Sequence, residues 1–233
     1  MAKNNNQIPN RVYEALKAEI LSMRLEPGYS ISEIETSKRF NVSRTPVRDA
    51  FRRLESDGLI EVKPHIGTFV SLIDLETISD IMYMREKIEI GIVEDLATII
   101  TQAQIFRLKV ILVKQKELLS RESDDKELSL EFINLDNDFH RMIFELAGKE
   151  GVWEMLNQLQ NHYLRFRVFI DLNDKKRLSK LLDAHETILE CIIQKDMTKI
   201  KDLYQHHLYD GVQDSTTKIF EYAKYFKYVS TIQ

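Results

Sequence analysis

A mainly α-helical fold is predicted by three properties of the sequence. Chain breakers are scarce, with seven glycines and four prolines among 233 residues, and this favours long helices over a turn-rich β protein. From Leu75 onward, apolar residues recur almost everywhere at steps of three and four, the spacing that gathers them on one helix face. Strand-like residues are confined to a short stretch, residues 59–70. We therefore expect helices with one small β element.

Composition sets the broad class of the protein. Hydrophobic residues make up 43% and charged residues 30% of the chain, an ordinary globular balance. The single cysteine, Cys191, excludes an intrachain disulfide framework, fits a reducing compartment and is expected to be an inert core residue. The N-terminus is polar, and no run approaches the roughly 20 apolar residues of a membrane span. We expect a cytoplasmic protein that does not bind membranes.

Two short helices are expected first. Apolar residues at helical spacing predict an amphipathic helix over Arg11–Met23, and the turn dipeptide Pro27-Gly28 ends it. Ser30 or Ser32 can cap a second helix, because a serine hydroxyl accepts a hydrogen bond from a backbone N–H in the first turn.

A third helix is predicted over Thr45–Ser56. Thr45 is expected as its N-cap, with Pro46 at the first helical position, and Gly58 suits a left-handed residue after the helix. Two short strands follow, at residues 59–62 and 68–70, and residues 64–67 form the turn between them. Three helices followed by a small β-hairpin form the outline of a winged helix-turn-helix.

The third helix also concentrates arginine. Residues 1–72 carry 11 Lys/Arg against 9 Asp/Glu, a net +2, whereas the remainder carries 22 against 28, a net −6. Arg44, Arg48 and Arg52 recur every four residues beside the apolar stripe, and Arg53 lies on the other flank. A cationic ridge near the start of a helix is the shape that reads bases in the major groove of DNA.

A surface role is the alternative for these arginines. In that reading Arg48 and Arg52 form a solvated face, balanced by neighbours such as Asp49 and Glu55. The preceding helix, the Thr-Pro start and the following hairpin favour DNA binding.

The motifs VSRTPVRDAFRRLESDGLI and PHIGTFV, within about residues 10–72, resemble the DNA-binding domain of GntR-family bacterial transcription regulators. The resemblance implies that Arg44, Thr45 and Arg48 touch DNA and that the hairpin around His65 and Gly67 probes the minor groove.

The sequence departs from this family at three places. Ile66 and Ile34 stand where many relatives carry arginine, and Thr36-Ser37 replaces a Leu-Ala pair. The recognition-helix contacts are therefore more firmly implied than the wing and first-helix contacts, and the operator sequence is left open.

The rest of the chain is expected to be an all-α bundle of six to seven helices. Periodicity places helices at about residues 75–100, 103–121, 125–148, 151–171, 177–195 and 198–226.

Four polar residues interrupt the apolar stripes of this bundle. Asp136 and His140 lie four residues apart on one helix face, and His185 and His207 occupy stripe positions on two later helices. Buried carboxylates and imidazoles need partners, and these four can satisfy one another. One carboxylate and three neutral imidazoles suit a divalent transition metal. The alternative is that each histidine is a separately satisfied core residue.

The segments DNDFHRMIFELAG, AHETILECI and HHL resemble the FCD ligand-binding domain of the FadR-like branch of the GntR family, over about residues 75–225. The resemblance implies an all-helical bundle and a metal held by Asp136, His140, His185 and His207. We expect zinc, with nickel or manganese as alternatives. His206 should point about 100° away from the site.

Arg85 lies on the stripe of the first bundle helix. It can receive the carboxylate of an effector, or it can form a salt bridge with a neighbour such as Glu89. His162, Tyr163, Arg165 and Arg167 are further candidates for the pocket. The apolar pattern does not decide which side of the helix they occupy.

These observations predict a transcriptional regulator, with a repressor favoured, that binds a near-palindromic double-stranded DNA operator as a homodimer and senses a small organic acid. A hinge is expected around Ser71–Leu75. The expected parts are a flexible N-terminus (1–9), the DNA-binding domain (10–72), a linker (73–77), the FCD-like domain (78–226) and a tail (227–233).

Three alternatives remain. The metal can be the direct signal, or it can be purely structural. A metal-dependent enzyme is the third, because metal-bound water is a nucleophile. No general-base carboxylate in register with the ligands and no nucleophile motif such as G-x-S-x-G is found, so we expect no enzyme.

Overall fold

The computed structural model describes residues 7–122, 125–159, 161–172 and 174–229. It divides into two compact units. Unit 1 takes its described residues from 7–75, 161–166 and 218–229, and unit 2 takes them from 76–159 and 167–217. The expectations of a flexible N-terminus and a C-terminal tail fall partly on residues 1–6 and 230–233, which lie outside the described residues.

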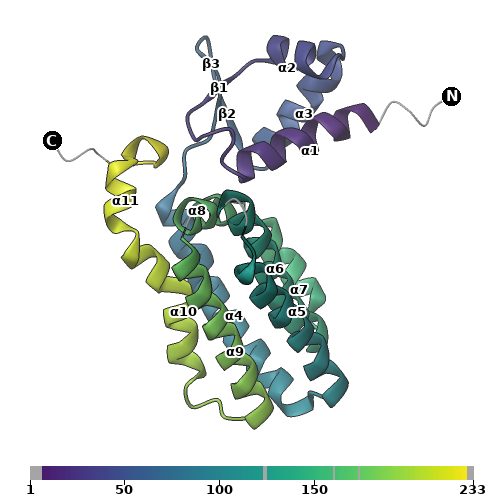
Figure 1. Cartoon of the computed structure of the whole chain (residues 1–233). Coiled ribbons are helices and arrows are strands. Elements are labelled where there is room, and N and C mark those ends of the chain that lie inside the picture. Colours follow the sequence, from purple (N-terminus) through teal and green to yellow (C-terminus); the bar gives the residue numbers. More distant parts are fainter. Residues whose placement is uncertain (1–6, 123–124, 160, 173, 230–233) are drawn as a thin grey trace. The chain divides into compact units, whose positions relative to one another are not determined.

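Unit 1 contains the expected helices and a small sheet (Figure 1). Its first elements are α1 (Gln7–Leu21), β1 (Ser30–Ile31), α2 (Glu33–Phe40), α3 (Arg44–Ser56), β2 (Ile60–Lys63) and β3 (Gly67–Val70). The sheet is antiparallel with the order β1-β3-β2. The hairpin was predicted, but β1 was not, because a two-residue strand leaves no periodic signal. It pairs Ser30 with Phe69 and Ile31 with Thr68.

Local chemistry explains the helix ends. The Ser32 side chain caps α2 by accepting a hydrogen bond from the Ile34 N–H at 3.2 Å. The expected Thr45 cap of α3 is wrong, because the helix begins at Arg44 and its N-cap is Ser43, whose side chain makes no capping hydrogen bond. Gly58 has a φ of +69° after α3, the left-handed conformation predicted for it.

The core of unit 1 holds α3 in place. The stripe on α3 is buried as predicted, with Val47, Ala50 and Leu54 fully enclosed. Together with Phe51 of the same helix, it packs into one hydrophobic cluster with residues from α1, β1 and the hairpin region: Val12, Tyr13, Leu16, Ile20, Ile31, Leu59, Ile60 and Val70. Burying one face of α3 leaves its arginine-bearing face to solvent.

Unit 1 also includes segments distant in sequence. Residues 161–166 begin α8 (Asn161–Asp171), and the last elements are α11 (Thr216–Glu221) and the 3₁₀ turn η1 (Ala223–Tyr225). The Arg165 guanidinium donates to the Ser71 carbonyl at 2.7 Å, and the Ile73 N–H donates to the Tyr225 carbonyl at 2.8 Å. The segment expected to act as a hinge is thus hydrogen-bonded inside unit 1.

Within its described residues, unit 2 consists of α-helices and the turns that connect them. Besides the end of α8 and the start of α11, it contains α4 (Leu75–Ile99), α5 (Gln102–Ser120), α6 (Asp125–Leu146), α7 (Glu150–Gln158), α9 (Lys175–Gln194) and α10 (Ile200–Asp214). Figure 1 shows α5, α6, α9 and α10 side by side. Within the described part of the chain, no helix combines the length and apolar character needed to span a membrane.

Two predicted helices of the bundle are broken. The helix expected over 151–171 is split into α7 and α8, and the helix expected over 198–226 is split near Ser215. The described residues after 74 therefore form eight α-helices, one more than the upper expectation. Periodicity misses such breaks because the apolar stripe resumes within a residue or two. The fold class, a winged helix-turn-helix with a helical bundle, is confirmed.

Candidate functional site

One candidate site is the exposed face of α3. Arg44, Thr45, Arg48 and Arg52 are all solvent-exposed there, and the opposite side of the helix is buried. Three of them carry a guanidinium, which donates paired hydrogen bonds to guanine or phosphate. The predicted cationic ridge is therefore present on the surface of unit 1.

Glu33 on α2 contacts this ridge. Its carboxylate lies 3.2 Å from Arg48 and 3.7 Å from Arg44. The sequence offered Asp49 and Glu55 as partners for Arg48 and Arg52, but the ion pairs of Arg44 and Arg48 are made with Glu33 of the preceding helix. Both arginines remain more than half exposed, so the pairs are weak and leave the guanidinium groups available to DNA.

The wing turn lies at the tip of the hairpin. His65 and Ile66 are exposed, and the Ile66 N–H donates to the Lys63 carbonyl at 3.0 Å. His65 has a φ of +63° and Gly67 a φ of +150°. Gly67 suits its place because a side chain with such a backbone conformation is strained. The two predicted wing residues thus sit at an exposed, tightly turned tip.

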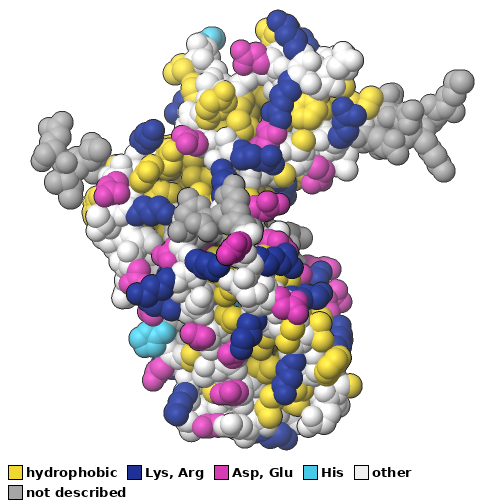
Figure 2. Space-filling model, viewed as in Figure 1, with side chains coloured by type: hydrophobic (Ala, Val, Ile, Leu, Met, Phe, Trp, Pro, Cys, Tyr) yellow, Lys and Arg dark blue, Asp and Glu magenta, His cyan; other side chains and the backbone are white. Residues whose placement is uncertain are grey.

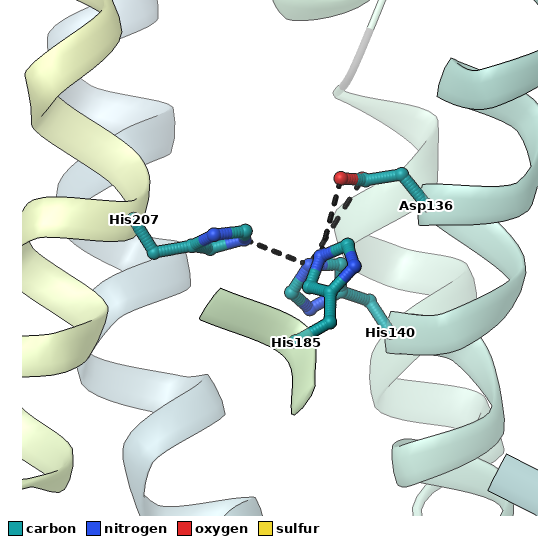
Figure 3. Close-up of side chains that lie close together, drawn as sticks. All are labelled: Asp136, His140, His185 and His207. Atoms are coloured by element: carbon teal, nitrogen blue, oxygen red, sulfur yellow. Dashed lines mark hydrogen bonds and ion pairs between the residues drawn. The ribbon is translucent and has the colours of Figure 1, made fainter. Parts of the chain in front are cut away.

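The second candidate site is buried in unit 2. Asp136 and His140 come from α6, His185 from α9 and His207 from α10, and Figure 3 shows them pointing toward one centre. One candidate ligand atom from each of the four residues lies within 4.8 Å of the others. The first three are completely or almost completely buried. The structure therefore brings together all four residues singled out in the sequence.

The distances in this cluster are short. The Nε2 atoms of His140 and His207 are 3.1 Å apart, and His185 Nε2 is 3.3 Å from Asp136 Oδ1. His140 Nε2 is 3.9 Å from Asp136 Oδ2. Neighbouring ligand atoms of a tetrahedral zinc ion with bonds of about 2.0–2.1 Å lie about 3.3 Å apart. The spacing of the four side chains fits a small cation.

Glu89 on α4 supports His140. Its Oε2 lies 2.7 Å from His140 Nδ1, and its Oε1 receives the Arg85 Nε–H at 2.5 Å. All three side chains are buried. A carboxylate at Nδ1 places the ring proton there and leaves Nε2 with its lone pair toward the centre of the cluster.

Gln115 on α5 supports His185 in the same way. Its Oε1 lies 3.0 Å from His185 Nδ1, and an amide oxygen accepts the ring N–H, which leaves Nε2 as the free donor atom. Phe139 stacks on the His185 ring with centroids 4.5 Å apart. These contacts fix the orientation of His185.

Asp136 also belongs to a buried chain of charges. Arg167 on α8 donates two hydrogen bonds to the Asp136 carboxylate and pairs with Asp171 at 3.3 Å. Asp171 in turn accepts from Arg177 on α9. A Cβ on Gly211 would lie 1.9 Å from Arg177 Nη2, so the absence of a side chain on α10 is what admits this guanidinium.

Burial sets the protonation of the cluster. It lowers the pKa of His185 and lowers that of His207 well below its ordinary value. Burial opposes ionisation of Asp136, but the charge of Arg167 and the nearby His185 outweigh it and hold the pKa of Asp136 well below its usual range. The same balance, set by Arg85 and His140, lowers the pKa of Glu89 to about 2. Neutral imidazoles beside an ionised carboxylate are the forms that bind metal.

The donor set fits a divalent transition metal. His185 Nε2 is buried and makes no well-aligned hydrogen bond within the described residues, although its other nitrogen is held by Gln115. Three nitrogens and one carboxylate are preferred by zinc and its neighbours over magnesium or calcium.

A cavity reaches the cluster from one side. It has a volume of about 160 Å³ and lies between α9 and α10. Apolar walls come from Leu181, Ala184 and Leu203, and polar groups come from Arg177, Lys180, His206, His207, Asp210 and Asp214. His207 is the one cluster residue in this lining. His206, beside it, is exposed and contacts Asp210 at 3.2 Å, in agreement with the expected rotation away from the site.

The remaining candidates separate into two groups. Arg85 forms the salt bridge with Glu89 that was its structural alternative, and Arg167 joins the cluster through Asp136. Arg165 and His162 instead lie in unit 1, where Arg165 contacts Ser71 and His162 Nδ1. Tyr163 is buried.

The sequence reading missed Gln115, and it named Glu89 only as an ion-pair partner of Arg85 and not as a support for His140. Glu89 follows Arg85 by four residues, and Gln115 interrupts the stripe formed by Ile111, Leu112 and Leu118. Both are polar residues at buried helical positions, so the signal that identified the histidines was also present for them.

Comparison with known proteins gives consistent matches. The family of bacterial regulatory proteins called gntR matches residues 9–70, and the FCD domain matches residues 80–210. The transcriptional repressor RspR of Escherichia coli K12 is 28% identical, over 91% of this chain and 90% of its own. The gluconate operon transcriptional repressor of Bacillus subtilis is 27% identical, over 90% and 85% respectively.

A solved structure supports the fold. Escherichia coli McbR/YncC superposes with a TM-score of 0.66 at 20% identity, covering 93% of this chain and 98% of that one. The FCD match alone covers more than half of the chain. The chain therefore belongs to the GntR family of bacterial transcription regulators and carries an FCD domain.

Proposed function

We propose that this protein is a metabolite-responsive repressor that binds a near-palindromic operator as a homodimer. The relatives RspR and the gluconate operon regulator are named as repressors. A two-fold dimer presents two copies of α3, so that its operator would contain two related half-sites.

Residues 10–72 carry the DNA-binding role in this proposal. Arg44, Arg48 and Arg52 meet bases and phosphates, and Thr45 contributes a hydroxyl near the start of α3. His65 and Gly67 place the wing tip against the minor groove. The exposed ridge on a helix whose opposite face is buried is the observation that supports these roles.

Residues 78–226 carry the sensing role. Asp136, His140, His185 and His207 would hold a divalent transition metal, with zinc favoured and nickel or manganese as alternatives. A bound metal would supply a positive centre for the oxygens of a small organic acid. The buried four-residue cluster, with its nitrogens oriented by Glu89 and Gln115, is the observation that carries this part of the proposal.

Arg85 is assigned to effector binding with a condition. Its Nε–H already donates to Glu89, so an effector carboxylate would have to share the guanidinium with that residue. A supporting role, in which Arg85 fixes Glu89 against His140, needs no such rearrangement.

The metal assignment is tested by His185→Ala. The variant should lose most of its metal after dialysis against buffer, whereas His206→Ala, which changes an exposed neighbour of the cluster, should keep the wild-type content. Elemental analysis measures both. Full occupancy in His185→Ala contradicts the ligand assignment.

Operator binding tests the regulatory role. Fluorescence anisotropy with an operator taken from the DNA around the gene should show tight binding, and titration with organic acids should change that affinity. An effector changes the affinity for DNA only if it binds the DNA-competent and the DNA-incompetent conformations of the protein with different affinities. If metal alone changes operator affinity, the direct metal-sensor alternative is favoured. Loss of fold on metal removal, with no effect of any acid, favours a structural metal.

A further inference from the structure

A groove on unit 2 lies away from the histidine cluster. It runs between α5 and α9 with a volume of about 420 Å³. Residues at steps of three and four line each side: Lys109, Leu112, Val113 and Lys116 from α5, and Glu186, Leu189, Glu190 and Ile193 from α9. Such spacing places each set on one helix face.

The groove has an apolar floor and exposed apolar edges. Leu112 and Leu189 are buried at its base, whereas Val113 is 53% and Ile193 is 38% exposed. Phe106, two turns before Val113 on α5, is 68% exposed. Figure 2 shows hydrophobic side chains interspersed with basic ones on the lower part of unit 2, where α5 and α9 face the viewer. Single exposed apolar residues are ordinary, but a lined apolar groove indicates an interaction surface.

Charge is sorted between the two walls. The α5 wall carries Lys109 and Lys116, and the α9 wall carries Glu186 and Glu190. Lys116 and Glu186 already approach to 4.0 Å across the groove, and both are well exposed. One row of cations therefore faces one row of anions, with apolar side chains between them.

This arrangement is complementary to itself in one orientation. If a second copy is related by a two-fold axis that runs along the helices in the plane of the contact, the cationic row of each copy meets the anionic row of the other. A two-fold axis perpendicular to the helices in that plane would bring like charges together. Charge pattern thus selects one symmetric pairing of this face with itself.

We propose that the α5–α9 groove is the face through which two copies of this chain pair, with α5 of each copy against α9 of the other. This inference rests on the homodimer of the proposed function and adds its surface and orientation. Lys109 and Lys116 of one copy lie opposite Glu186 and Glu190 of the second, and Val113 and Ile193 are enclosed between them.

Charge reversal tests the pairing. Lys109→Glu with Lys116→Glu makes both walls acidic, and Glu186→Lys with Glu190→Lys makes both walls basic. Each double variant should dimerise at least about tenfold more weakly than wild type, because like charges then face each other. An equimolar mixture of the two should form heterodimers, since an acidic face meets a basic one. Sedimentation velocity and native mass spectrometry measure the two effects.

A matched control uses Lys114→Glu with Lys201→Glu. Lys114 is an exposed residue of α5 outside the groove, and Lys201 is exposed on α10. This variant carries the same change in net charge as Lys109→Glu with Lys116→Glu and should dimerise like wild type. Circular dichroism of every variant should match wild type, because the substituted side chains are on the surface.

The outcomes separate this inference from the proposed function. A wild-type dimer that binds operator and is equally stable in both reversed variants overturns the groove assignment and leaves the regulator intact. If the reversed variants dimerise more weakly but form no heterodimer when mixed, the groove assignment is also overturned. If the wild-type chain remains monomeric and does not bind operator DNA, both the groove assignment and the proposed function are overturned.

Discussion

The two candidate sites use charge in opposite ways. On α3, Arg44 and Arg48 are exposed and paired only loosely with Glu33, whereas in unit 2 the Asp136 carboxylate is enclosed and accepts two hydrogen bonds from the Arg167 guanidinium. An exposed charge costs little to keep, so α3 can hold its arginines ready for a polyanion. A buried charge must be matched residue by residue, so the cluster in unit 2 is part of the stability of the bundle as well as a candidate ligand site.

The largest expected effect follows from removing one buried charge. Asp136→Ala removes one of the two carboxylates that pair with the enclosed Arg167, and should lower the free energy of unfolding by about 3–5 kcal/mol. Urea denaturation measures this. Asp138→Ala, on the same helix, removes an exposed carboxylate that pairs with Arg141, and should cost no more than about 1 kcal/mol. Equal losses in the two variants would contradict the contrast between the sites.

An exposed arginine should show the reverse pattern. Arg48→Ala is expected to weaken operator binding by about 1–3 kcal/mol, the value of a good paired contact to a base. Its free energy of unfolding should change by less than about 0.5 kcal/mol. Arg53→Ala is the control, because Arg53 lies over the Tyr13 ring at 3.8 Å on the other flank of α3. If anisotropy titrations show a larger loss of operator affinity for Arg53→Ala than for Arg48→Ala, the DNA does not contact the Arg44–Arg48–Arg52 face of α3.

A partly buried group gives an intermediate case. Burial, assisted by Arg165, lowers the pKa of His162 to about 4, so the unfolded chain binds a proton at this position before the folded chain does. The contribution of His162 to the free energy of unfolding is therefore fully present above pH 6.5 and is lost as the pH falls toward 4.

The variant His162→Asn should remove this slope, because its amide oxygen can still accept from Arg165. The difference in unfolding free energy between pH 7.5 and pH 4.5 should shrink by about 2 kcal/mol, a value reduced from about 3 kcal/mol because the ring is partly exposed. Denaturation curves at the two pH values provide the measurement. An unchanged pH dependence would mean that His162 is solvated in the folded protein.

The smallest expected effect concerns orientation. Gln115→Leu removes the hydrogen bond to His185 Nδ1 and leaves every candidate ligand in place. Zinc affinity, measured by competition with a chelating dye, should fall about tenfold. Gln102→Leu changes an exposed glutamine at the start of the same helix and should have no effect. Equal affinities in both variants would show that packing against Phe139 alone orients the ring.

The fold was predictable where local pattern and local chemistry agree. The stripe of Val47, Ala50 and Leu54, with Gly58 after it, identified α3 almost to the residue. The β1 strand and the breaks after Gln158 and at Ser215 were not predictable, because a two-residue strand and an interruption of one or two residues carry no period of their own. They depend on what each segment packs against.

For the candidate site in unit 2, too, the sequence predicts what depends on local spacing and misses what depends on how the helices pack. Asp136 and His140 share a helix face by spacing alone, so sequence could pair them with each other. The convergence of His185 and His207 was inferred from the cost of burying them singly. Gln115 was missed, Glu89 was named only as a partner of Arg85, and Arg167 was named without a facing, because the sequence does not state which helix faces lie opposite one another.

Glu33 has a consequence for how the protein would scan a genome. Its carboxylate lies beside Arg44 and Arg48, so a phosphate that approaches either guanidinium meets a nearby negative charge. Under the proposed DNA contacts, this repulsion would shorten the residence time on arbitrary DNA more than on a sequence that offers both arginines paired contacts at once. A single acidic side chain on α2 would thereby favour rapid departure from wrong sites during the search.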